Sequence, residues 1–173
     1  MKEFTIKNLK PEELVIVNKW PQFFIVPMDG SYTDQYIKLG HIKEEESCNL
    51  RYSMEFGIGW LGLADKLAER ACTLVDLLVK SGIQPDARIT SCIMKEKFGT
   101  LTNQGDHNLT GIYREIWRVL ESHIEYLSSQ TCEVCGDYGK LDKSSNWVKA
   151  LCEKHSGQEK RYKMEPEQLH GTE

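Results

Sequence analysis

Four metal-ligating side chains at fixed spacing constrain the fold of this 173-residue chain more than any other feature of its sequence. Cys132 and Cys135 form a Cys-x-x-Cys pair, and Cys152 and His155 form a Cys-x-x-His pair after an interval of sixteen residues. A two-residue gap lets one tight turn present two ligands, and two such pairs about 15 to 20 residues apart are typical of structural zinc. We therefore predict a zinc knuckle over residues 131–156. All four ligands come from the protein, which leaves no open position for catalysis.

The first cysteine pair has two other interpretations. A redox dithiol would require a thioredoxin-like βαβ context, which the neighbouring sequence does not offer. The remaining interpretation is a chance occurrence of both pairs at this spacing. Trp147 lies between the two pairs and is predicted to pack as the small core of the knuckle. Cys72 lies within an apolar helical pattern, so we predict a small buried side chain there.

Two amphipathic helices are predicted before the knuckle. Over residues 61–81 apolar side chains recur every three or four positions, and Gly82 and Pro85 mark the end of the helix. The second helix covers residues 110–129, with Thr110 as its N-cap. Its predicted core-facing stripe is made up of Ile112, Tyr113, Ile116, Trp117, Leu120, Ile124 and Leu127.

The remaining segments predict a small sheet. Over residues 88–95 the side chains alternate between two faces, which predicts a strand. The apolar runs at 14–17 and 23–26 are predicted as an irregular hairpin or as two strands at a sheet edge. The fold class is therefore α+β, with a small sheet packed on two amphipathic helices and a C-terminal zinc knuckle. We predict an α+β domain over 1–130, the knuckle over 131–156 docked on it, and a flexible tail over 157–173.

The charge balance argues against bulk nucleic-acid binding. The chain has 22 basic and 26 acidic residues, a net charge of −4, whereas binding to a phosphate backbone needs a basic surface. A local basic segment remains over 154–163, with Lys154, Lys160, Arg161 and Lys163 as candidate contacts. We find neither a membrane-spanning apolar run nor a signal-peptide core, so we expect a cytoplasmic protein.

Acid/base chemistry has only weak support. Gly105, Asp106 and His107 fall in a predicted polar loop over 102–108, and they offer residue types that an enzyme could use. Nothing in their spacing forces them together, so a solvated loop is the simpler interpretation. Residues 57–62 are glycine-rich but lack a phosphate-binding motif, and we predict a turn at the start of a helix with Trp60 as its anchor.

Three stretches together carry a resemblance. They are Phe56-Gly57-Ile58-Gly59-Trp60, the segment Met94-Lys95-Glu96-Lys97-Phe98-Gly99-Thr100-Leu101, and the knuckle itself. Their order resembles a loose group of uncharacterised small bacterial and phage proteins with a GDGW helix start, a KEKFGxLR strand end and a CExCG…W…LCxxH knuckle. This chain departs from the pattern at Ile58, where the group often has Asp, and at residues 102–103, where an Arg-aromatic strand usually continues. The resemblance implies no established activity.

The function is therefore predicted as a choice between classes. The first is a zinc-stabilised, non-enzymatic binding protein, phage-encoded as the resemblance implies, that docks on a host protein as inhibitor, counter-defence factor or adaptor in the bacterial cytoplasm. Its candidate contacts are Lys95, Lys97 and Phe98. These residues could equally form a strand end whose charges face solvent and whose Phe98 reaches the core. The alternatives are a nucleic-acid-binding regulator that uses the zinc knuckle and the basic segment over 154–163, and a small enzyme that uses residues 105–107. The oligomeric state stays open.

Overall fold

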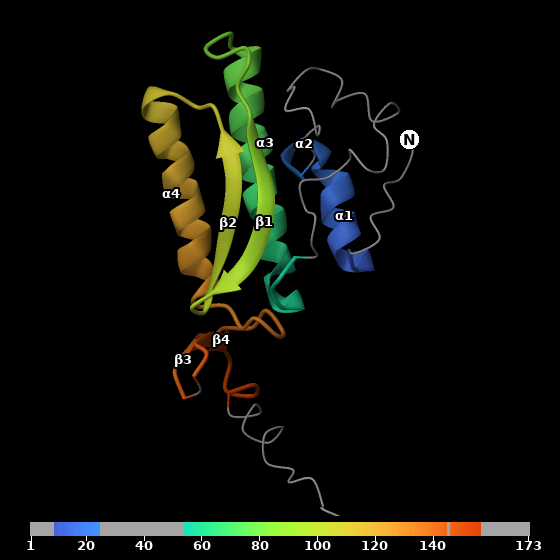
Figure 1. Cartoon of the computed structure of the whole chain (residues 1–173), viewed down its shortest axis with the longest axis vertical. Helices are drawn as coiled ribbons and strands as arrows, with labels where there is room; N and C mark the ends of the chain where they lie inside the picture. Colours follow the sequence, from blue (N-terminus) through green and yellow to red (C-terminus); the bar gives the residue numbers. More distant parts are fainter. Residues whose placement is uncertain (1–8, 25–53, 145, 157–173) are drawn as a thin grey trace, which may run out of the picture.

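The computed structural model describes residues 9–24, 54–144 and 146–156 (Figure 1). The elements in these ranges are helices α1 (Pro11–Lys19) and α2 (Pro21–Phe24), the 3-10 helix η3 (Ile58–Trp60), helix α3 (Leu61–Lys80), strands β1 (Ile89–Lys97) and β2 (Thr100–His107), helix α4 (Gly111–Ser128), and strands β3 (Lys140–Asp142) and β4 (Lys149–Leu151). The predicted α+β class is confirmed. Helices α3 and α4 pack on the antiparallel β1–β2 hairpin, and a second hairpin, β3–β4, follows α4.

Helix α3 agrees with its prediction. It begins directly after η3 and ends before Gly82, which has the left-handed backbone (φ +72°) of a helix stop. Its buried face consists of Ala64, Leu67, Ala68, Ala71, Cys72, Leu74 and Leu78. Burial raises the pKa of the Cys72 thiol to about 12, so this cysteine is the neutral, packed side chain that the sequence predicts.

Helix α4 agrees with its prediction in extent but not entirely in orientation. Thr110 occupies the N-cap position, although its side chain makes no capping hydrogen bond. Two residues of the predicted core-facing stripe, Ile112 and Ile116, are exposed. The others are buried or packed against the core: Tyr113, Trp117, Leu120, Ile124 and Leu127.

The β1–β2 hairpin is longer than predicted. Strand β1 continues to Lys97, and its pairing with β2 runs from Ile89 opposite His107 to Lys97 opposite Thr100, with a register shift between Ser91 and Ile93. The prediction of a loop over 102–108 is therefore wrong, because residues 102–107 belong to β2. Antiparallel pairing uses backbone groups, so a strand with polar side chains and one solvated face is stable beside β1.

The predicted N-terminal strands are also wrong. Residues 14–17 lie in α1 and residues 23–24 in α2, whereas 25–26 lie outside the described residues. Helix α1 forms because Pro11 suits a first helical position and Glu13 accepts a hydrogen bond from the Lys10 backbone N–H (3.0 Å). Phe23 and Phe24 are fully buried, and the Phe23 ring meets Trp117 edge-on at 6.4 Å. These apolar runs thus complete the core as helices.

Candidate metal centre

The four predicted ligands lie on two tight turns that the β3–β4 hairpin joins. The Gly136 backbone N–H donates to the Cys132 carbonyl (2.8 Å), and the His155 backbone N–H donates to the Cys152 carbonyl (3.0 Å). Each hydrogen bond closes a turn that presents two ligands together. Strands β3 and β4 pair antiparallel, which brings the second turn beside the first.

The ligand atoms of Cys132, Cys135, Cys152 and His155 all lie within 4.8 Å of one another. The Sγ atoms of Cys135 and Cys152 are 3.8 Å apart, and His155 Nδ1 lies 3.4 Å from Cys132 Sγ and 3.2 Å from Cys152 Sγ. A tetrahedral zinc ion with bonds of about 2.3 Å to sulfur and about 2.0 Å to nitrogen requires S–S separations of about 3.8 Å and S–N separations of about 3.5 Å. The group is therefore placed so that it could hold a metal ion, and three thiolates with one imidazole form a donor set that zinc accepts.

The pKa values of Cys132 and Cys135 are shifted in opposite directions. Burial favours the neutral form of Cys132, but backbone hydrogen bonds at its sulfur, with a further one to the His155 ring, outweigh burial and lower its pKa to about 6. At Cys135 the Asp137 backbone N–H favours the thiolate, yet desolvation and the neighbouring sulfurs of Cys132 and Cys152 outweigh it and raise its pKa to about 11. The Cys132 thiolate therefore forms readily, and its presence disfavours a second thiolate at Cys135. A cation among the donors would stabilise them together.

The first ligand turn rests directly on η3. The Gly59 N–H donates to the Glu133 carbonyl (2.8 Å), the Gly57 N–H donates to Glu133 Oε1 (3.0 Å), and Trp60 Nε1 donates to the Thr131 carbonyl (2.7 Å). Trp60 is fully buried, which confirms its predicted role as an anchor. A Cβ atom at Gly59 would lie 2.2 Å from the Cys132 carbonyl oxygen, so the two backbones meet at van der Waals distance. The glycines before α3 thus position the metal turn.

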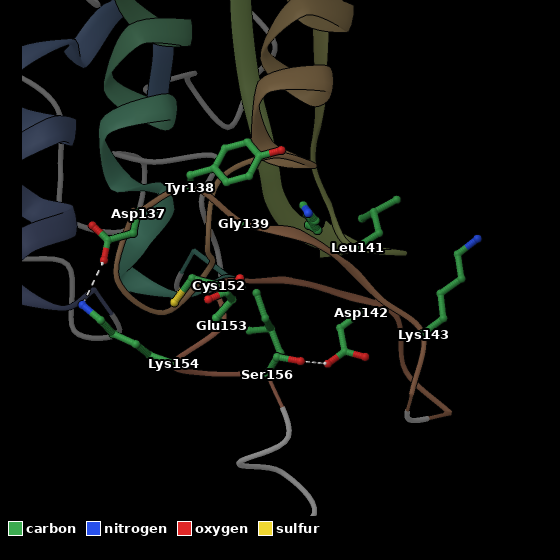
Figure 2. A pocket seen from close by; sticks show the side chains of 12 residues that line it. Asp137, Tyr138, Gly139, Leu141, Asp142, Lys143, Cys152, Glu153, Lys154 and Ser156 are labelled. Carbon is green, nitrogen blue, oxygen red and sulfur yellow. Dashed lines mark hydrogen bonds and ion pairs between the residues drawn. The ribbon is translucent and has the colours of Figure 1, made fainter.

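The β3–β4 hairpin carries an open hollow of about 670 Å³ next to Cys152 (Figure 2). Its charged lining consists of Asp137, Asp142, Glu153, Lys140, Lys143 and Lys154. Lys154 Nζ lies 3.9 Å from a carboxylate oxygen of Asp137, and Ser156 donates to Asp142, as Figure 2 shows. Three acids and three lysines cancel, so this surface lacks the net positive charge that binding to a phosphate backbone needs.

The predicted contacts Lys95, Lys97 and Phe98 lie at the turn between β1 and β2. Lys97 and Phe98 are exposed, whereas Lys95 is half-buried in the paired part of β1. Phe98 has a left-handed backbone (φ +53°), and the Lys97 ammonium lies 5.8 Å from the centre of its ring. The alternative in which Phe98 reaches the core is wrong, because the side chain is 71% exposed.

Trp147 does not form the small core of the knuckle. It is 59% exposed, and its Nε1 donates to Glu96 Oε2 at the end of β1. The other oxygen of that carboxylate, Glu96 Oε1, accepts a hydrogen bond from the Gly99 backbone N–H (2.7 Å). A Cβ at Gly99 would lie 2.6 Å from a methyl carbon of Leu141, so the β1–β2 turn also rests on β3. The sequence gives no signal for this contact, since the two segments are remote along the chain.

Residues 105–107 lie in strand β2, away from the cysteine group in the fold, and not in a loop. A cavity of about 320 Å³ between β2 and α4 is lined by His107, Asn103 and Glu121 among others. Asn103 Nδ2 donates to Glu121 Oε1 (3.0 Å). Burial raises the pKa of Glu121 and lowers that of His107, so both environments favour the neutral form. Glu121 could not be found from sequence, because its partner is set by how α4 packs on β2.

The candidate basic contacts lie on both sides of residue 156, where the described part of the chain ends. Lys154 is exposed on the knuckle, whereas Lys160, Arg161 and Lys163 lie outside the described residues, as does the predicted tail. Among the helices in the described ranges, none combines the length and apolar character that crossing a bilayer requires.

Comparison with known proteins identifies no relative: no family model, no curated protein and no solved structure matches this chain. The Cys3His group is the part of the resemblance that the structure supports.

Proposed function

We propose that this chain is a zinc-stabilised, non-enzymatic binding protein that docks on another protein. The contact would be made by the turn surface, which we define as Lys97, Phe98, Leu141 and Trp147. The supporting observation is the display of Phe98, an aromatic side chain held in a left-handed turn with most of its ring in solvent.

An aromatic residue at this position buries little of its surface within the chain, since Phe98 is 71% exposed. A left-handed backbone costs roughly 1–2 kcal/mol for a residue with a Cβ atom, and glycine or asparagine would make the same turn with less strain. Exposure means that burial of the ring does not offset this cost. Residues in unfavourable backbone conformations concentrate at binding sites, where the display of a side chain justifies the strain.

The neighbouring contacts hold the turn surface in one arrangement. Glu96 accepts hydrogen bonds from both the Gly99 backbone and the Trp147 indole, and Leu141 packs beneath Gly99. The Trp147 indole and the backbone that carries Phe98 are therefore held in place before any partner arrives. Pre-ordered aromatic side chains are effective anchors in protein interfaces, because little rotational freedom remains to be lost on binding.

The charge distribution favours a protein partner over nucleic acid. Over residues 131–156 the lysines at 140, 143, 149 and 154 are balanced by acids at 133, 137, 142 and 153. Lys97, beside Phe98, adds a positive charge at the edge of the turn surface and suits a carboxylate at the rim of a partner's pocket.

Zinc has a structural role in this proposal. Three thiolates and one imidazole would fill a tetrahedral site, which leaves no position for substrate or water. The metal would join the two turns at the ends of the β3–β4 hairpin and so hold Leu141 and Trp147 against the β1–β2 turn. In this way zinc would support the surface without taking part in chemistry.

The test is affinity capture from a nuclease-treated bacterial lysate, chosen because the resemblance points to bacterial and phage proteins. Wild type is compared with Phe98→Asn, which keeps the turn and removes the ring, and with Val15→Asn, which removes an equally exposed apolar side chain from α1. We expect one stoichiometric protein that wild type and Val15→Asn retain and Phe98→Asn loses. Retention by Phe98→Asn would rule out the turn surface. Partners that disappear with nuclease would favour the nucleic-acid alternative.

A further inference from the structure

The cavity of about 320 Å³ between β2 and α4 lies toward the end of the β1–β2 hairpin that is remote from the turn surface. Asn103, Gly105 and His107 line it at alternate positions of β2, and Trp117 and Glu121 line it from α4. Alternate strand positions share a face, so the missing side chain of Gly105 leaves space between its two neighbours. A Cβ at Gly105 would lie 1.8 Å from the Thr90 carbonyl oxygen, so the close approach of β1 keeps this position a glycine.

A chain of hydrogen bonds that starts in the core fixes the Glu121 carboxylate at the cavity wall. Ser91 Oγ, which is fully buried, donates to Asn103 Oδ1 (2.7 Å), so the amide nitrogen of Asn103 points toward α4. That nitrogen donates to Glu121 Oε1 (3.0 Å). Each oxygen of an ionised carboxylate can accept two hydrogen bonds, so acceptor positions remain on Glu121.

Glu121 has no counter-ion in the described part of the chain. No lysine, arginine or histidine there forms an ion pair with it, and the charged neighbour that acts on its pKa, Glu125, is itself acidic. Placing a half-buried carboxylate without a cation is costly. A glutamine would accept the same hydrogen bond from Asn103 without that cost. The fold therefore does not need the negative charge of Glu121.

The other charged groups of the cavity do not supply a cation either. Asp106 adds a second carboxylate to the lining, which contains no lysine or arginine, and Arg88 pairs with Asp106 (3.3 Å) from outside it. Burial lowers the pKa of His107, so its environment favours the neutral imidazole. His107 Nδ1 is buried and has no hydrogen-bond partner among the described residues. The cavity is thus negative and incompletely hydrogen-bonded.

The size of the cavity indicates an organic ligand. At about 30 Å³ for each water molecule, its volume corresponds to roughly ten waters, at the lower limit of small-molecule sites. Trp117 contributes an apolar wall, and the exposed Gly105 and Asp106 mark where the cavity opens to solvent. In the described part of the chain, the group placed to hold a metal ion is the Cys3His group and not this one.

We propose that this cavity binds a small organic cation of the amidine or guanidine type, with Glu121 as its counter-ion. The planar pair of N–H groups in such a cation matches a carboxylate that Asn103 already holds in one orientation. The flat body of the ligand would lie against Trp117. This site is separate from the turn surface, so the two proposals can fail independently.

The experiment is an NMR titration of the zinc-loaded full chain with benzamidine, with benzamide as an uncharged probe of the same shape. We expect benzamidine, and not benzamide, to shift the signals of the Gly105 backbone and the Asn103 side-chain amide, while Gly139 in the knuckle is unaffected. Glu121→Gln should weaken binding by about 10-fold or more, because it removes the charge and leaves the bond from Asn103 in place. Glu69→Gln, at an exposed position of α3, is the matched control and should bind as wild type does.

Two further probes distinguish the sources of such a cation. Tighter binding of methylguanidine would indicate a free small molecule, whereas tighter binding of a blocked glycine-arginine-glycine peptide would indicate an arginine side chain of another protein. Equal binding of benzamidine and benzamide, or a Glu121→Gln variant that titrates as wild type does, would overturn the proposal. Benzamidine shifts that appear only outside the cavity would overturn it as well.

Discussion

The contact between η3 and the first ligand turn leads to our most specific prediction, which concerns Gly59→Ala. A Cβ at Gly59 would lie 2.2 Å from the Cys132 carbonyl oxygen and 2.5 Å from the Gly136 nitrogen. Both are backbone atoms, so neither can rotate away as a side chain would. The turn that carries the first two ligands must therefore move off η3 by about 1 Å or more to reach ordinary carbon–oxygen contact.

The expected magnitude follows from the hydrogen bonds that join the two segments. Three bonds, donated by Gly57, Gly59 and Trp60, cross this contact. At about 1 kcal/mol each, their loss lowers the free energy of unfolding by about 3 kcal/mol. Trp60 is fully buried, so displacement of the Thr131 carbonyl also leaves the indole N–H without its acceptor and adds to the loss.

The assay is urea denaturation of the zinc-loaded protein, with Gly62→Ala as the matched control. Gly62 lies three residues further on in α3, and nothing is within 4 Å of its hypothetical Cβ. Alanine there should stabilise the helix by up to about 1 kcal/mol. The two alanine variants should thus differ in opposite directions from wild type. If both shift the midpoint equally, the ligand turn does not rest on η3, and the reasoning is refuted.

Three further predictions concern the ligands, the turn and α4. His155→Ala should sharply lower both the zinc content, measured by mass spectrometry, and the melting temperature. Cys72→Ala should leave the zinc content unchanged. Equal zinc content in both variants would show that the ligands are misassigned. Phe98→Asn should raise the free energy of unfolding by up to about 1 kcal/mol, because asparagine tolerates the left-handed backbone, and a loss of stability in thermal denaturation would contradict this. Glu121→Gln should stabilise the chain at neutral pH. Burial raises the pKa of Glu121 in the folded state, so the folded chain binds more protons than the unfolded chain above the ordinary glutamate pKa, and stability falls as pH rises through that window. Denaturation against pH should show this fall in wild type and not in the glutamine variant; identical profiles would contradict it.

The sequence predicts those elements whose signals are local. The two long helices follow from apolar periodicity and from a terminating Gly82, and the ligand set follows from spacing alone. Each of these features depends on residues within one segment or on a known chemical requirement. For that reason they could be predicted without knowledge of the tertiary packing.

The wrong predictions have two causes: local helix-start signals that were outweighed at residues 14–17, and distant partners in the case of β2 and Trp147. Residues 14–17 read as a strand because they are apolar and β-branched, yet Pro11 and Glu13 are signals of a helix start. Strand β2 has a polar sequence, and its structure comes from pairing with β1. Trp147 is predicted in the knuckle core because it lies between the two ligand pairs, but its partner, Glu96, lies on another hairpin.

The two oxygens of Glu96 have a consequence for how this protein can be imitated or recognised. One oxygen shapes the turn that carries Phe98, and the other positions a tryptophan 51 residues away in sequence. A synthetic peptide that covers the β1–β2 turn would contain Phe98 but not the neighbouring indole, and would compete poorly for a partner of the intact chain. Antibodies against that region would be expected to distinguish folded from denatured protein. By the same reasoning, two unrelated chains could present the same pair of rings without sharing any continuous stretch of sequence.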